Sequence, residues 1–158
     1  MTASAKIELT HWTPRYAEAL DAFELPAEQL QFTALPKDAL SQAADQHSIV
    51  ILSEGTPVGF FVLHSSERVH EYSANPRAML LAALSIDRRQ QGKGYAKLGM
   101  LALPGWIRTH FPNCNEVVLA VNHKNRPARQ LYWNACFADT GRRRMGPNGE
   151  QWIMSRKW

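Results

Sequence analysis

Gly92 and Gly94 stand one residue apart, between an apolar run and an amphipathic stretch that begins at Tyr95. Glycine has no Cβ atom, so its backbone can adopt positive φ and its N–H group can approach an anion closely. A helix that starts directly afterwards would add free amides and the positive end of its dipole. Arg89 and Lys93 would add mobile charge. The segment predicts a site for a nucleotide or coenzyme phosphate, and a plain tight connection is the alternative.

Two well-known phosphate loops do not fit this segment. The dinucleotide-binding pattern needs a third glycine, and Lys97 takes its place. The triphosphate-binding pattern needs Gly-Lys followed by Ser or Thr, which is missing here. The choice of ligand therefore depends on the rest of the chain.

A second segment, residues 121–137, lies some thirty residues further on. Together the two segments resemble the GNAT N-acetyltransferase superfamily. The first family pattern, Gln/Arg-x-x-Gly-x-Gly/Ala, is met by Arg89, Gly92 and Gly94. The second pattern, Asn-x-x-Ala-x-x-Leu-Tyr-x-x-x-Gly-Phe, is met by Asn125, Ala128, Leu131, Tyr132 and Phe137, with Cys136 at the usual glycine. The resemblance covers about residues 48–155.

The resemblance implies an α/β (α+β) fold with a mixed, mainly antiparallel seven-stranded sheet, helices on both faces, and strands 4 and 5 splayed apart. A chain of 158 residues has room for one such domain, 1–158. The implied acyl donor is acetyl-CoA, attacked directly by a primary amine without a metal. The expected partner is a small-molecule amine, and a homodimer is compatible with this interpretation.

Site residues follow from the same resemblance. Leu84, Ser85 and Ile86 would bind the pantetheine arm, and an amide near Leu84 would stabilise the oxyanion, unless this is an ordinary buried strand. Tyr132 would protonate the departing thiolate, because a phenol keeps its proton at neutral pH; its alternative is a core aromatic. The other implied coenzyme contacts are Arg89, Gln90, Gln91, Gly92, Lys93, Gly94, Tyr95, Ala96 and Asn125, the last also a favoured helix cap.

The general base is not evident. An ammonium group must lose a proton before it attacks, yet residues 79–86 contain no carboxylate. Glu71 is the tentative base, and His70 and His64 could also reach the acceptor side. Each could equally be a solvated surface residue, with the proton leaving through ordered water.

Charge is divided unevenly along the chain. Residues 1–75 hold four Lys/Arg and ten Asp/Glu, whereas residues 76–158 hold fourteen and four, giving −6 and +10. A basic second half suits the phosphates of coenzyme A, and an acidic first half suits an amine; solvated surface charge is the alternative. The wall of the amine site could contain Phe23, Glu24, Glu28 and Phe32.

Hydrophobic patterning and turn residues predict the elements. We expect strands at residues 6–10, 48–52, 58–64, 79–86, 116–121, 137–145 and 150–154. Helices are expected at 14–23, 37–45, 92–110 and 125–135. Pro104 should kink the third helix or end it early.

Cys114 and Cys136 lack metal-type or redox spacing, and the sequence starts without a signal peptide, so a cytoplasmic chain with free thiols is expected. No apolar run is long enough to cross a bilayer. Cys136 occupies a position that usually needs left-handed backbone. The helix could end differently here, and the thiol could be a small buried hydrophobe or a reactive group. Histidine spacing predicts no metal site.

Three functions fit these features. The first is acetyl-CoA-dependent acetylation of a small amine. The second is the same reaction on a protein N-terminus, a lysine or an aminoacyl-tRNA, with Arg142, Arg143 and Arg144 contacting phosphates. These side chains alternate in a strand, so a solvated edge is the simpler interpretation and nucleic acid is not expected as a partner. The third is a non-catalytic acetyl-CoA-binding module, against which Tyr132 argues.

Overall fold

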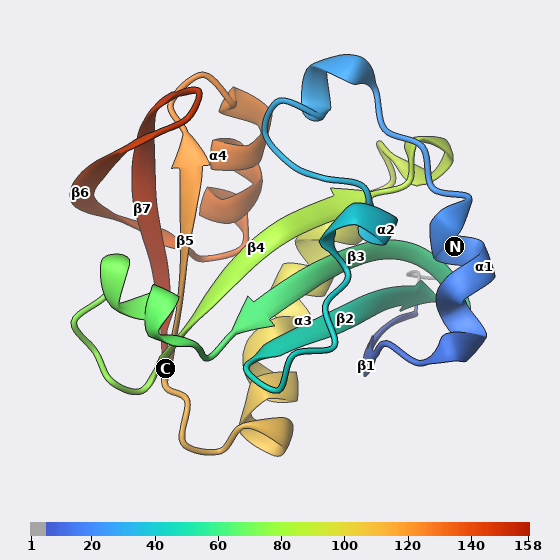
Figure 1. Ribbon diagram of the computed structural model, residues 1–158, viewed down its shortest axis with the longest axis horizontal. Coiled ribbons are helices and arrows are strands. Elements are labelled where there is room, and N and C mark those ends of the chain that lie inside the picture. Colours follow the sequence, from blue (N-terminus) through green and yellow to red (C-terminus); the bar gives the residue numbers. More distant parts are fainter. Residues whose placement is uncertain (1–5) are drawn as a thin grey trace, which may run out of the picture.

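The computed structural model describes residues 6–158 and contains one seven-stranded sheet of order β1-β2-β3-β4-β5-β7-β6 (Figure 1). Neighbouring strands are antiparallel except for β4 and β5, which are parallel. The mixed, mainly antiparallel sheet is therefore as predicted. The strands are β1 Ile7–His11, β2 Gln46–Ser53, β3 Thr56–His64, β4 Ala78–Ile86, β5 Glu116–Asn122, β6 Ala138–Gly146 and β7 Gly149–Lys157.

Helices cover both faces of the sheet, as predicted. The long α3 (Tyr95–His110) packs on one face, and the short α1 (Ala17–Asp21) and α2 (Pro36–Ala39) lie on the other (Figure 1). Strand β2 shows why its sequence is continuously apolar: Ile49 and Ile51 belong to the core under α3, while Val50 and Leu52 belong to the cluster around α1. A strand that is covered on both faces has no polar side.

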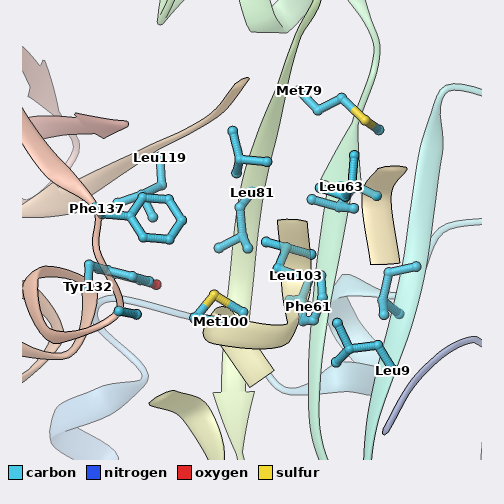
Figure 2. Packing of buried hydrophobic residues seen from close by; sticks show 14 of the residues in the cluster. Leu9, Phe61, Leu63, Met79, Leu81, Met100, Leu103, Leu119, Tyr132 and Phe137 are labelled. Carbon is cyan, nitrogen blue, oxygen red and sulfur yellow. The ribbon is translucent and has the colours of Figure 1, made fainter. Parts of the chain in front are cut away.

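The core under α3 reaches from the first strand to the fourth helix, α4 (Arg126–Asn134). Met100 and Leu103 of α3 lie against Phe61 of β3 and Leu81 of β4, and Tyr132 closes this core at the α4 side (Figure 2). The fold thus attaches the candidate catalytic helix to the main core.

The first two helices are shorter than predicted. Residues 14–23 form a 3-10 turn, η1 (Pro14–Tyr16), followed by only five residues of α1, and α2 ends at Ala39 instead of residue 45. The loop after α2 bonds to β2 instead of continuing as a helix: the Ser48 hydroxyl accepts from the Ser41 amide and donates to its carbonyl. Tertiary contacts override local helix propensity here.

Pro104 lies inside α3, and the helix continues to His110. The prediction of an early end was wrong. Pro104 is buried beside Leu103 and Ile107, which are almost fully enclosed in the core. We attribute the continuation to this packing, which offsets the hydrogen bond that proline removes.

Candidate active site

The strands β4 and β5 separate after a short paired stretch. Their ladder joins only residues 78–80 to residues 116–118, and both strands continue beyond it. In Figure 1 the two strands meet near the C-terminus and diverge toward their carboxyl ends. The expected splay is therefore present, and it leaves an opening in the middle of the sheet.

A β-bulge in β4 lies beside this opening. Phe60 pairs with Ser85 and Val62 pairs with Ala82, so two residues of β4 oppose one residue of β3. The bulged Ala83 has a φ of 57°, in the left-handed region. The extra residue reverses the facing of the strand: Leu84 now packs on the α3 side, where an unbroken alternation would turn it away.

The phosphate loop has the geometry that its glycines predict. Gly92 and Gly94 have φ values of 78° and 82°, and no protein atom lies within 4 Å of where a Cβ would stand. Gly94 is the N-cap of α3, so no side chain caps the helix, and its first turn contains no acidic residue. The first amides of this sixteen-residue helix are therefore open to an anion.

Arg89 was predicted to contact the coenzyme, but its side chain does not face the phosphate loop. Its guanidinium donates to Asp87, at 3.0 Å from Nε, and to the carbonyl of Ala22, which turns it away from the opening. The family pattern fits the sequence in a second register, which starts at Gln91 and reaches Gly94 and Ala96. All three residues of the second register line the cavity described below. We missed this register because the first one also satisfied the pattern.

Asn125 caps α4, as its residue type predicts. Its side-chain oxygen accepts from the amide of Ala128 at 3.3 Å. About two turns later Tyr132 lies edge-on to Phe137, with 5.6 Å between ring centroids, and its hydroxyl points toward Met100 (Figure 2). Burial raises the pKa of Tyr132, so the phenol is protonated at neutral pH and can act as a donor.

Cys136 adopts the left-handed conformation that glycine usually takes, with a φ of 71°. The amide of Cys136 bonds to the carbonyl of Trp133 at 3.1 Å, and that of Phe137 bonds to the carbonyl of Tyr132 at 2.9 Å. These two bonds form a Schellman motif. The helix therefore ends in the usual way, and the thiol is exposed; the expectations of a different ending and of a buried Cys136 were wrong.

The segment of residues 24–35, which we call the acceptor segment, crosses the open end of the two strands. It contains the 3-10 turn η2 (Ala27–Gln29). It is attached to the coenzyme loop by a bond from the Glu24 amide to Asp87 at 3.0 Å and by reciprocal side-chain bonds between Gln29 and Gln91. Thr33 donates to the Leu84 carbonyl at 3.0 Å.

The turn between β6 and β7 forms a further side of the opening between β4 and β5. Asn148 donates to the carbonyl of Gln31 at 2.6 Å, and Asn122 at the end of β5 donates to the carbonyl of Asn148 at 3.0 Å. The acceptor segment, this turn and β5 are thereby joined around the opening.

Together these elements enclose a cavity of about 680 Å³. The predicted site residues that line it are Leu84, Ser85, Ile86, Gln90, Gln91, Gly92, Gly94, Tyr95, Ala96, Asn125 and Tyr132. Lys97 and Lys124 also line it and were not predicted as site residues, although both lie within the motif segments. Positive charge and open amides therefore lie on the same side of the cavity.

Three predicted site residues do not line the cavity: Arg89, Lys93 and Glu71. Lys93 is exposed and bonds to the side chain of Gln90. Glu71 lies in η3 (Glu67–Glu71), which precedes the start of β4, whereas the cavity lies along the far half of that strand. Glu71 therefore lies outside the cavity, and the geometry gives no support to its expected role as the base.

The predicted acidic and aromatic wall is only partly present. Glu28 and Phe32 line the cavity, and Glu28 is its one carboxylate among the described residues. Phe23 is buried in the core beneath α1, and Glu24 does not line the cavity. The amine site therefore has less negative charge than the sequence suggested.

Within residues 6–158, no group of three or more His, Cys, Asp or Glu side chains is arranged to hold a metal ion. No helix in the same part of the chain is long and apolar enough to span a membrane.

Known proteins resemble this chain in sequence or in fold. The chain is 47% identical over 152 residues to the uncharacterized N-acetyltransferase YbbJ of Bacillus subtilis, covering 94% of this chain and 95% of that one. A crystal structure of the aminoglycoside acetyltransferase AAC(6')-Ib with coenzyme A superposes with a TM-score of 0.75 at 15% identity, covering 96% and 95%. The ribosomal L7/L12 alpha-N-protein acetyltransferase RimL, also with coenzyme A, gives a TM-score of 0.75 at 13% identity, covering 98% and 95%.

The two structures share the fold at identities too low to transfer a substrate. The sequence model of the Acetyltransferase (GNAT) family matches residues 9–136, most of the chain. The chain therefore belongs to the GNAT family and is an N-acetyltransferase, an enzyme whose acyl donor is acetyl-CoA.

Proposed function

We propose that this enzyme transfers the acetyl group to the primary amine of a small molecule, by direct attack of the amine on the thioester. The observation that carries this proposal is the cavity at the split between β4 and β5, which the acceptor segment lines on one side. Its volume of about 680 Å³ is in the range of sites for small ligands. The bond from Asn148 to Gln31 joins the turn between β6 and β7 to the acceptor segment beside this cavity.

The proposed coenzyme site uses the backbone more than side chains. The pyrophosphate would lie on the amides from Gly92 to Ala96, with Lys97 and Lys124 nearby. The pantetheine arm would follow Leu84, Ser85 and Ile86, whose strand has no ladder partner on the β5 side. The Ser85 hydroxyl is buried without a hydrogen-bond partner, which is unusual unless a ligand satisfies it.

The proposed transfer needs four functions from the protein. Binding in the cavity places the amine and the thioester together. An amide of β4 near Leu84 would stabilise the oxyanion. Tyr132, kept protonated by burial, would donate to the departing sulfur. The fourth function is removal of the ammonium proton.

An aminoacyl-tRNA acceptor is less well supported. Its phosphate contacts would need Arg142, Arg143 and Arg144, and each of these makes contacts within the protein. Arg142 donates to the carbonyl of Tyr72, Arg144 donates to the hydroxyl of Tyr72 at 2.8 Å, and Arg143 pairs with Asp139 at 2.8 Å. These arginines stabilise the β6 edge of the sheet.

The test is a mass-spectrometric screen of the purified protein with acetyl-CoA. The panel contains amino sugars, amino-acid amides, polyamines and aminoglycosides, together with peptides that carry a free N-terminus or a lysine. We expect acetylation of a small amine at a rate well above that of any peptide. Acetylation of the peptides alone would contradict the proposed acceptor class.

A further inference from the structure

His64 is a buried histidine that the fold does not explain. It is the last residue of β3, is 6% exposed, and pairs in the sheet with Gln46 on one side and Leu80 on the other. Its Nδ1 atom is buried without a hydrogen-bond partner. A neutral imidazole has one N–H donor and one acceptor nitrogen, and buried polar atoms are almost always paired. An unpaired one therefore needs a reason.

The histidine lines a second pocket, of about 430 Å³, on the α1 and α2 side of the sheet. This pocket shares a wall with the main cavity. The residues that line both are Gln31, Phe32 and Thr33 of the acceptor segment, and Ala82 and Ala83 at the β4 bulge. The bulge thus separates the proposed place of acetyl transfer from the pocket that contains His64.

The main cavity itself offers no well-placed base. Among the described residues that line it there is no histidine, and its one carboxylate, Glu28, belongs to an exposed residue of the acceptor segment. Glu71 lies outside it. An acceptor amine has a pKa of about 10 and arrives as an ammonium ion, so some group must take its proton.

We propose that His64 is the proton acceptor for the amine, and that water in the second pocket carries the proton to it. The proposal rests on the amine transfer proposed above and assigns its missing base. Because Nδ1 is enclosed, Nε2 is the nitrogen that receives the proton from the pocket.

The charged groups around His64 suit this role. Burial and the neighbouring Arg68 lower the pKa of His64, Asp45 opposes them, and His47 adds a further lowering. The ring is therefore neutral at neutral pH and ready to accept a proton. Once protonated, it lies close to the guanidinium of Arg68, which also lines the pocket and favours release of the proton to solvent.

The proposed sequence of steps balances. The ammonium ion gives one proton to His64, and the free nitrogen lone pair attacks the thioester carbon. As the tetrahedral intermediate collapses, the carbon–sulfur bond breaks and sulfur takes the hydroxyl proton of Tyr132. The new amide nitrogen loses its second proton, which restores Tyr132. The proton on His64 leaves through the pocket, so each turnover releases one proton.

The first test compares His64→Gln with His70→Gln. His70 is an exposed histidine in η3 and lines none of the described pockets, so it is a matched control. Using the amine that is acetylated fastest in the screen, we expect kcat/KM to fall about 10²-fold or more in His64→Gln and to stay unchanged in the control. Acetyl-CoA affinity, measured by calorimetry, should be unchanged in both, which separates loss of a base from loss of folding.

The second test uses pH and rescue. In the wild type, kcat/KM should rise with pH through the lowered pKa of His64, below 6.5, and this acid limb should be absent from His64→Gln. Added imidazole should restore part of the activity of His64→Ala, because the pocket has room for the missing ring. A structural role would show neither effect.

Two results would overturn the proposal: unchanged kcat/KM with an unchanged acid limb in His64→Gln, or an NMR titration in which His64 is protonated at pH 7. If only peptides are acetylated, the same comparison is made with the best peptide. That outcome would contradict the small-molecule acceptor while still testing His64, so the two failures can be told apart.

Discussion

Polar groups at the paired end of β4 and β5 are satisfied within the protein, whereas several at the open end are not. At the paired end the buried Glu116 carboxylate accepts hydrogen bonds from Ser73, Asn75 and Ser155. At the open end the Ser85 hydroxyl has no partner and the amides of α3 have no cap. The two ends of this strand pair therefore have different roles. Hydrogen bonds within the protein stabilise the fold at the paired end, and the polar groups without partners at the open end are available to a ligand.

The largest expected effect tests the open end. Tyr132→Phe keeps the ring that packs on Phe137 but removes the proton donor, so kcat should fall by about 10²–10⁴-fold. The affinity for acetyl-CoA should be nearly unchanged, as measured by calorimetry on the same variant. A wild-type kcat, with acyl transfer shown to limit turnover, would return Tyr132 to a purely structural role.

The second effect tests the paired end. Glu116→Gln replaces an acceptor-only carboxylate among three donors, so the free energy of unfolding should fall by about 1–3 kcal/mol at neutral pH. Chemical denaturation would measure it. Glu67→Gln, at an exposed position of η3, is the control and should change stability by less than about 0.5 kcal/mol. Equal losses in both variants would contradict a special role for the buried cluster.

Protonation of Glu116 at low pH should lower the free energy of unfolding. Burial tends to raise the pKa of Glu116, but the hydrogen bonds from Ser155, Ser73 and Asn75 outweigh it and hold the pKa below the ordinary value. The folded protein thus binds this proton less readily than the unfolded chain. The contribution of the ionised Glu116 to the free energy of unfolding is fully present above the pKa that this residue has in the unfolded chain. It is lost as pH falls through the lower pKa of Glu116 in the folded protein. Glu116→Gln should lack this part of the acid dependence.

A change in the phosphate loop should weaken coenzyme binding. Gly94→Val puts a branched side chain at a φ of 82° and at the start of the open helix amides, so acetyl-CoA affinity should fall at least about tenfold. Gly105→Ala is the matched control, because this exposed glycine of α3 has open space around it. It should leave affinity unchanged and raise stability slightly. Unchanged affinity in folded Gly94→Val would place the pyrophosphate elsewhere.

A smaller effect concerns the end of the helix that carries Tyr132. Cys136→Gly removes a Cβ from left-handed backbone, so the free energy of unfolding should rise by about 0.5–1 kcal/mol. Cys136→Ala removes the thiol but keeps the Cβ and should give no such gain. If both variants behave alike in thermal denaturation, backbone strain at this position is negligible.

The smallest expected effect concerns charge at the acceptor side. Glu28→Gln removes the carboxylate that lines the cavity, so the KM of a cationic acceptor should rise about threefold, less so at high salt. Glu24→Gln and Glu71→Gln should have no effect, since neither residue lines the cavity. Steady-state kinetics at two salt concentrations measures all three. Equal shifts in all variants would mean that only the general charge of this half matters.

The contrast between the two ends also explains what the sequence could reveal. The glycine loop, the cap at Asn125 and the positions of the strands along the chain depend on local backbone chemistry and periodicity, and all were predictable; the mixed sheet was expected only from the family resemblance. The direction of Arg89 was not, because it is set by Asp87, a buried carboxylate whose burial no local pattern indicates. Glu71 was predicted as the base because it lies close to β4 in the sequence. It precedes the start of that strand, however, whereas the cavity lies along the far half. His64 was one of three candidate bases in the sequence, and only the pocket that it lines distinguishes it from Glu71 and His70.

Besides its bonds to Gln91 and Asn148, the acceptor segment is attached at two places to β4 or its direct continuation. The amide of Glu24 bonds to Asp87 at one place, and Thr33 bonds to the backbone of Leu84 at the other. Between these anchors, Glu28, Gln29, Gln31 and Phe32 line the cavity, and none of residues 25–32 belongs to the hydrophobic core clusters. The length and side chains of such a segment can change without disturbing the core. Substrate preference can therefore diverge while the coenzyme-binding residues keep their geometry.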